Sequence, residues 1–225
     1  MKKILLITHH DFGDPGIISK ILHKRYFIST VNYKNLKNIK SNDINSYSTF
    51  IFFGGKMSAN SKSINISYEY NFISNLIRLN KNILGICLGA QMIAQIFGSK
   101  VNHSKSKQIE VGYRKILPID KKLFRSNMSF LQFHNEGISK NSSMEVIANG
   151  RIFDVDAYKI KDQNIFGLQF HPEVTEYMIK NWYNNLKNKK AKGIDKLENI
   201  LKDHKKYNNV NYSWMENFLN TAFYD

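Results

Sequence analysis

The chain has 225 residues, which suits one domain or one domain with a small appendage. Hydrophobic residues make up 42% of it, and no apolar run approaches the roughly 18 to 20 residues needed to cross a bilayer, so we expect a cytoplasmic protein without membrane contact. The single cysteine, Cys87, excludes an intrachain disulfide and a zinc site built from cysteines, and the net charge of +15 is spread along the sequence rather than gathered into a stripe that would bind nucleic acid.

Short apolar runs alternate with helical patterns in the first half of the chain. The apolar runs predict buried strands at 3–8, 27–31, 50–53 and 83–86. Apolar residues at helical spacing predict helices at 17–22, 68–78 and 88–97, the last of them ended by Gly98. This alternation predicts an α/β fold with a doubly wound, mostly parallel central sheet and flanking helices.

The second half of the chain has a different pattern, with short strand-like pieces at 113–117, 130–133, 144–148, 157–160 and 165–169. We expect these to add late, antiparallel strands to the sheet. A helix is predicted at 175–186, a polar linker at 188–192, and two amphipathic helices at 195–204 and 213–223. We therefore divide the chain into a domain at 1–187 and a helical extension at 188–225 that packs on it and carries no catalytic group.

A nucleophile elbow is the sharpest local signal in the sequence. Cys87 lies between an apolar strand and an apolar helix, with Gly85 two residues before it and Gly89 two residues after it. Glycine is needed there because such a tight turn crowds its neighbours. A thiol at a helix N-terminus faces free N–H groups that stabilise negative charge, and the N–H of Leu88 is placed to bind an oxyanion.

A base for this thiol is predicted at His171. It follows the strand at 165–169, Pro172 fixes the backbone just after it, and Glu173 is close enough to reach the far nitrogen of the imidazole. A carboxylate in that position sets the tautomer of the histidine and stabilises the imidazolium. The sequence therefore predicts a triad of Cys87, His171 and Glu173.

A second oxyanion donor is expected at the end of another strand. Gly54 and Gly55 directly follow the strand at 50–53, and a glycine N–H can approach a substrate closely. Taken alone, such a pair is as often an ordinary glycine turn.

The segments named above, together with Gly167 to Glu173, resemble class I (triad) glutamine amidotransferases, and within them a stand-alone group similar to the amidotransferase domain of GMP synthase. Supporting segments are Gly54-Gly55-Lys56-Met57-Ser58, Glu110-Val111-Gly112-Tyr113, Phe133-His134-Asn135-Glu136, and His10 with Pro15-Gly16. The resemblance covers about 3–182 and implies a Rossmann-like domain that hydrolyses the side-chain amide of glutamine through a glutamyl-thioester.

The resemblance also implies roles for individual residues. Cys87 would be the nucleophile, His171 the general base and then acid, and Glu173 its orienter, with oxyanion N–H groups from Gly55 and Leu88. Substrate contacts are implied at Gly54, Gln91, Phe133, His134 and Asn135. Two positions depart from the family pattern: Lys56 stands where proline is common, and Asn135-Glu136 replaces Gly-Asp. Neither departure touches the triad.

Other functions remain open on the sequence. The same triad would serve a hydrolase of another γ-glutamyl compound, and an idle domain could bind a partner or a γ-glutamyl ligand. The substrate is expected to be glutamine or a related γ-glutamyl small molecule, and a separate synthetase subunit is a possible partner. No cofactor and no metal are expected, because the remaining histidines have no metal-ligand spacing with acidic residues and no phosphate-binding loop is present.

Overall fold

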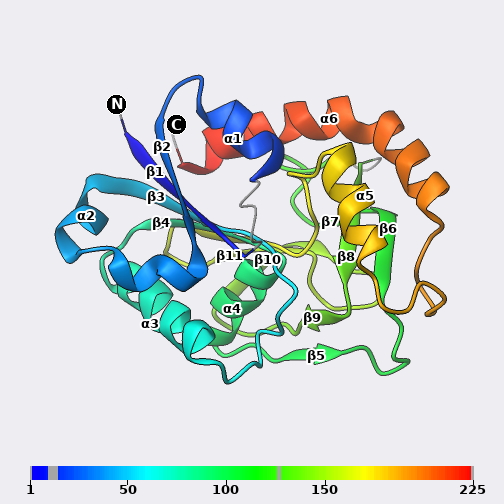
Figure 1. The fold of residues 1–225 in the computed structure, drawn as a ribbon, viewed down its shortest axis with the longest axis horizontal. Helices are drawn as coiled ribbons and strands as arrows, with labels where there is room; N and C mark the ends of the chain where they lie inside the picture. Colours follow the sequence, from blue (N-terminus) through cyan, green and yellow to red (C-terminus); the bar gives the residue numbers. More distant parts are fainter. Residues whose placement is uncertain (1, 10–14, 126–127, 224–225) are drawn as a thin grey trace.

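The computed structural model of the chain describes residues 2–9, 15–125 and 128–223. An eight-stranded sheet runs through the molecule in the order β2-β1-β3-β4-β12-β11-β10-β7 (Figure 1). Its strands are β1 (Lys3–Thr8), β2 (Phe27–Asn32), β3 (Tyr47–Phe52), β4 (Asn82–Ile86), β7 (Leu117–Pro118), β10 (Met144–Asn149), β11 (Ala157–Ile160) and β12 (Ile165–Leu168). Pairs from β2 to β12 are parallel, and β11, β10 and β7 continue the sheet antiparallel. The predicted mostly parallel α/β fold with late antiparallel strands is confirmed.

Helices cover both faces of this sheet because its central strands are apolar on both sides. Ile4 and Leu6 of β1 face α1 (Gly16–Leu22) and α6 (Leu197–Phe223). Leu5 and Ile7 face the opposite core, which is closed by η1 (Tyr33–Asn38), α2 (Ser41–Ser46), α3 (Ile64–Arg78) and α4 (Leu88–Ile96). The sequence patterns did not predict η1 and α2, which are short and largely polar. None of the described helices is long and apolar enough to cross a membrane.

Two small antiparallel sheets stand beside the central one. One pairs β5 (Val101–His103) with β9 (Glu136–Ile138), which the sequence did not predict, and the other pairs β6 (Glu110–Lys115) with β8 (Ser129–His134). The helix α5 (Glu176–Asn184) and the start of α6 pack on the β6–β8 pair. The prediction of a single strand at 113–117 was wrong, because β6 ends at Lys115 and β7 begins at Leu117. Ile116 is buried in the main core, and the chain passes there from the small sheet to the central one.

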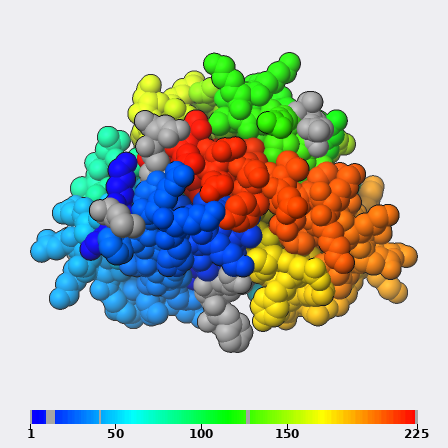
Figure 2. Space-filling model, turned by 90° about the horizontal axis from the view of Figure 1, so that it is seen from above, coloured from blue at the N-terminus to red at the C-terminus, as the bar shows by residue number. Residues whose placement is uncertain are grey.

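The C-terminal segment contains one helix of 27 residues, α6, rather than the two helices predicted. The polar stretch that suggested a break is helical, and within it Asn211 is buried and its side-chain amide donates to the carbonyl of Ser129 at 3.0 Å. Before α6, the N–H of Val111 donates to the carbonyl of Gly193, so this segment runs along β6. Figure 2 shows α6, orange to red, crossing one face of the molecule beside α1 in blue.

Candidate active site

Cys87 lies at the turn between β4 and α4, as the elbow predicted. Its backbone has φ of 50°, in the left-handed region that residues with a side chain rarely adopt. The two flanking glycines are required by space. A Cβ atom on Gly85 would strike the backbone of Ala90, and one on Gly89 would strike the carbonyl of Phe52. The turn therefore presents Cys87 directly at the N-terminus of a helix.

His171 and Glu173 follow β12 and lie next to this turn. The Nδ1 atom of His171 is 2.7 Å from Oε1 of Glu173, and both side chains are buried. Burial by itself lowers the pKa of His171, but the charges of Glu173 and Cys87 and hydrogen bonds to both raise it to about 10. Trp182 of α5 packs edge-on against the imidazole, with ring centroids 4.8 Å apart. The histidine is therefore held from two sides.

The glycine pair after β3 lies against the same residues. A Cβ atom on Gly54 would be 2.7 Å from Cε1 of His171 and 3.3 Å from Cβ of Cys87. Among the described backbone groups, none accepts a hydrogen bond from the N–H of Gly55 or from that of Leu88. Leu88 directly follows Cys87, and Gly55 lines the same pocket as Cys87, so these two N–H groups are candidates to bind an oxygen atom placed beside the thiol.

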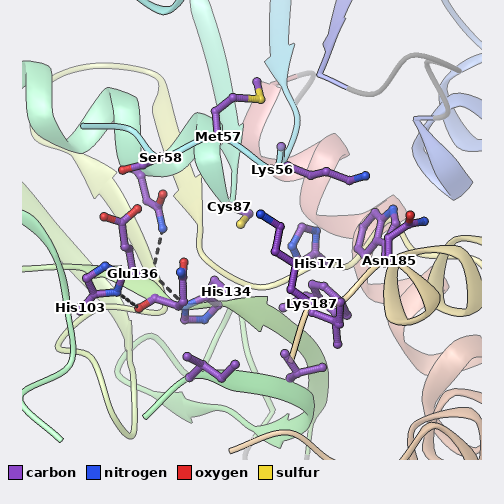
Figure 3. Close-up of a pocket in the computed structure, with 18 residues that line it drawn as sticks. Lys56, Met57, Ser58, Cys87, His103, His134, Glu136, His171, Asn185 and Lys187 are labelled. Atoms are coloured by element: carbon purple, nitrogen blue, oxygen red, sulfur yellow. Dashed lines mark hydrogen bonds between the residues drawn. The ribbon is translucent and has the colours of Figure 1, made fainter. Parts of the chain in front are cut away.

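A pocket of about 560 Å³ opens over Cys87 (Figure 3). Its walls come from the loop after β3, the start of α4, the β6–β8 pair and the end of α5. The predicted residues in its lining are Gly55, Cys87, Gln91, Phe133, His134, Asn135 and His171. Gly54, Leu88 and Glu173 are buried and outside that lining. The structure thus brings all the predicted site residues to one place.

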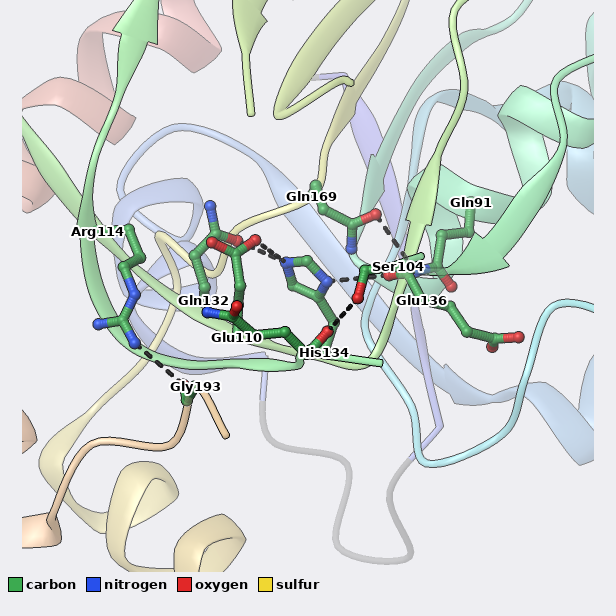
Figure 4. Close-up of polar contacts among 10 residues, drawn as sticks. Gln91, Ser104, Glu110, Arg114, Gln132, His134, Glu136, Gln169 and Gly193 are labelled. Atoms are coloured by element: carbon green, nitrogen blue, oxygen red, sulfur yellow. Dashed lines mark hydrogen bonds and ion pairs between the residues drawn. The ribbon is translucent and has the colours of Figure 1, made fainter. Parts of the chain in front are cut away.

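Two of the predicted substrate residues are bound to the protein itself. The side-chain amide of Gln91 donates to the carbonyl of Glu136 at 2.9 Å. The imidazole of His134 has one nitrogen 2.9 Å from the carbonyl of Glu136 and the other 2.9 Å from Oε1 of Gln132 (Figure 4). Burial lowers the pKa of His134 to about 3. His134 is therefore a member of a buried polar network in the wall of the pocket.

Several pocket residues were not expected from the sequence. Trp182 and Lys187 line the wall, whereas Lys56 and Glu136, which also line it, belong to segments that carried the resemblance (Figure 3). Glu136 could have been suspected, because it directly follows the segment expected to bind substrate. Lys187 and Trp182 had no such signal, since neither belongs to a motif and only the packing of α5 brings them to the site.

The loop before α1 also bears on the site. His10 lies outside the described residues, whereas Gly16 is described and has φ of 61°. A Cβ atom on Gly16 would strike the backbone carbonyl of Glu173, and the N–H of Ile17 donates to that same carbonyl at 2.9 Å. The start of α1 therefore holds the backbone that carries Glu173. Within the described part of the chain, no group of three histidine, cysteine or acidic side chains could hold a metal ion.

One family of proteins matches most of the chain. A family model described as glutamine amidotransferase class-I matches residues 11–185. The chain therefore belongs to the class I glutamine amidotransferase family, as its motifs suggested.

More specific similarities point to one branch of that family. A protein of Methanosphaera stadtmanae that is named as one subunit of GMP synthase (glutamine-hydrolysing) is 34% identical over 102 residues, which are 44% of this chain and 55% of the relative. The chain spans about half the length of the curated relatives it matches.

A glutamine amidotransferase of Thermotoga maritima has the same fold, with a TM-score of 0.86 over 100% of this chain and 99% of its own at 22% identity. One from Methylobacillus flagellatus has a TM-score of 0.83 at 18% identity, covering 96% of this chain and 92% of its own.

Proposed function

We propose that the chain hydrolyses the side-chain amide of glutamine to glutamate and ammonia, with Cys87 as nucleophile, His171 as general base and acid, and Glu173 as the residue that orients His171. The observation that carries the proposal is the strained Cys87 at a helix N-terminus beside a buried His171–Glu173 pair. Strain of this kind persists only where the surrounding structure enforces it, and it is typical of active sites.

In the proposed reaction, the imidazole of His171, whose pKa is raised to about 10, holds the proton of the thiol while Cys87 sulfur attacks the amide carbon. A C–S bond forms and the carbonyl electrons move to oxygen, which the N–H groups of Gly55 and Leu88 bind. The oxyanion then collapses, the C–N bond breaks, and ammonia leaves with the proton returned by His171. Water next attacks the thioester with His171 again as base, which releases glutamate and restores the thiol.

Glutamine would enter the pocket with its amide at Cys87. Gly54 would pack beside the amide, and Gln91 would contact the substrate from the start of α4. The α-amino and carboxylate groups would be held by backbone groups of Phe133, His134 and Asn135, since the imidazole of His134 is engaged within the protein.

We also propose that the ammonia is consumed by a separate synthetase subunit. The support is the relationship to proteins whose names describe one subunit of a glutamine-hydrolysing GMP synthase, which implies at least one further subunit. The chain would then bind glutamine as its substrate and an ATP-using synthetase subunit as its protein partner.

The proposal is tested by glutamate release from glutamine, measured beside a panel of other γ-glutamyl amides. Wild-type protein should release glutamate, and Cys87→Ser should not, although both should be folded by circular dichroism. A glutamine-mimicking electrophile should label Cys87 alone. Full activity of Cys87→Ala would refute the assignment, and preference for another amide in the panel would identify a different γ-glutamyl substrate.

A further inference from the structure

We infer that a buried pair outside the triad, His9 and Glu69, positions the proposed oxyanion donor Gly55. The inference rests on the proposed function, because it assigns a task within the same reaction. His9 follows β1, and Glu69 lies in the middle of α3. Nε2 of His9 is 2.9 Å from Oε2 of Glu69, and neither side chain has any exposed surface.

His9 lies directly against the loop that carries the donor. A Cβ atom on Gly55 would be 2.8 Å from Cβ of His9 and 2.9 Å from a methyl carbon of Leu88. Gly55 is therefore held between His9 and Leu88, and Leu88 supplies the other proposed donor. A shift of His9 would give the N–H of Gly55 room to turn away from the thiol.

Glu69 and Tyr33 determine where His9 lies. Tyr33 packs on the imidazole with ring centroids 4.9 Å apart, and Glu69 binds the imidazole edge. In the described part of the chain, Nδ1 of His9 and Oε1 of Glu69 are buried without a hydrogen-bond partner. Among the described residues, the bond between Nε2 of His9 and Oε2 of Glu69 is therefore the polar contact that fixes the rotation of the imidazole ring.

The same helix also anchors the far end of the loop. The hydroxyl of Tyr70, next to Glu69 on α3, lies 2.9 Å from the carbonyl of Ala59 and also contacts Oε1 of Gln95 in α4. The side-chain amide of Asn60 donates to the carbonyl of Val101 at 2.9 Å and to Glu136 at 3.1 Å. The loop after β3 is therefore tied to α3 at both ends, through His9 at Gly55 and through Tyr70 at Ala59.

Burying the His9–Glu69 pair costs free energy, and packing alone does not explain why two polar side chains occupy this position. Removing two polar groups from water is expensive, and apolar residues of similar volume are often as stabilising or more so. A pair that leaves one nitrogen and one oxygen unpartnered gains still less. A role in positioning Gly55 would explain why His9 and Glu69 are present, since one missing oxyanion donor costs about 100- to 1,000-fold in rate.

The test compares Glu69→Leu, which removes the acceptor at similar size, with Glu69→Gln, which keeps one. Two rates are measured on each protein: kcat for glutamine hydrolysis, and alkylation of Cys87 by iodoacetamide. Alkylation uses the same thiol but forms no oxyanion. Asn211→Leu is the matched control, because it removes a buried side-chain hydrogen bond to the carbonyl of Ser129, 3.0 Å long, from a residue outside the pocket lining.

For Glu69→Leu we expect kcat to fall by about 100- to 1,000-fold, the cost of a displaced oxyanion donor, with KM and the alkylation rate close to wild type. Glu69→Gln should restore most of kcat, and Asn211→Leu should lower the unfolding temperature but not kcat. Wild-type kcat in Glu69→Leu, or an equal fall in kcat and alkylation, would overturn the inference. Absence of glutamine hydrolysis in wild-type protein that alkylates normally would instead refute the proposed function.

Discussion

At the scale of single residues, the site depends on three side chains that different parts of the fold hold in place. Cys87 is fixed by the turn into α4, whereas His171 is held between Glu173 and Trp182. One carboxylate oxygen of Glu173 is hydrogen-bonded to the imidazole of His171, and its backbone carbonyl accepts a hydrogen bond from the N–H of Ile17. Each member of the proposed triad should therefore respond differently to substitution.

Loss of the base should be more severe than loss of its orienter. His171→Ala should lower kcat by about 100- to 10,000-fold, because proton transfer in both halves of the reaction depends on the imidazole. Glu173→Gln should cost less, since an amide oxygen can still accept from Nδ1. It should also lower the pKa of His171 below about 10, because the charge of Glu173 contributes to raising it. The pH–rate profile and kcat of both variants check this, and a more damaging Glu173→Gln would reverse the assigned roles.

Asp156 offers a pH test that is independent of catalysis. Burial, together with the charge of Glu110, raises the pKa of Asp156 to about 8 from its ordinary 3.8. The folded protein therefore keeps a proton that the unfolded chain has lost, so this group makes stability fall as pH rises from 3.8 to about 8. Asp156→Asn has no such dependence, and its stability relative to wild type should rise over that window and level off above it. Urea unfolding at pH 5, 7 and 9 measures the difference, which a constant offset would contradict.

At the scale of elements, α6 is part of the main core. Trp214 stacks on Phe124 and Phe218 with ring centroids 5.1 and 5.0 Å apart, and its indole N–H donates to the carbonyl of Leu123. Phe170, the residue before His171, is also in this aromatic cluster. The extension we placed at 188–225 thus covers a face of the sheet on which the site is built.

Trp214→Ala should lower the free energy of unfolding by about 3 to 5 kcal/mol, the cost typical of deleting a buried large aromatic side chain. Val210→Ala, on an exposed position of the same helix, should change it by no more than about 0.5 kcal/mol. Chemical denaturation measures both. We expect kcat per folded molecule to change far less than stability in Trp214→Ala. A stable variant that had lost only activity would show that α6 has a direct part in catalysis.

Some of these elements could be predicted and others could not. The strands and helices around Cys87 follow from local patterns, because strong apolar periods and flanking glycines leave few alternatives. The continuity of α6 could not be predicted, since its polar middle packs against parts of the chain distant in sequence, as the bond between Asn211 and Ser129, 82 residues apart, illustrates. The His9–Glu69 pair likewise joins residues 60 apart. Local patterns therefore identified the proposed nucleophile but not the packing that supports it.

At the scale of the whole molecule, the proposed partner determines how the isolated chain should behave. Ammonia released without an acceptor is wasted, so hydrolysis should be slow until a synthetase subunit binds. We expect the isolated chain to turn over glutamine well below the enzyme median of about 10 s⁻¹. Steady-state glutamate release checks this, with and without an ATP-using synthetase subunit. Turnover near that median without a partner would favour a self-sufficient γ-glutamyl hydrolase.

The contact between Gly16 and Glu173 affects how tolerant the protein is to mutation. Position 16 is outside the lining of the pocket and is 157 residues from Glu173 in sequence, yet any β-carbon there would push against the backbone carbonyl of Glu173. In a growth selection that depends on the proposed activity, a saturation library at Gly16 should be depleted almost as completely as one at Cys87. Screens that rank positions by their distance from the pocket would miss this position, so libraries meant to improve the proposed activity should leave the start of α1 unchanged.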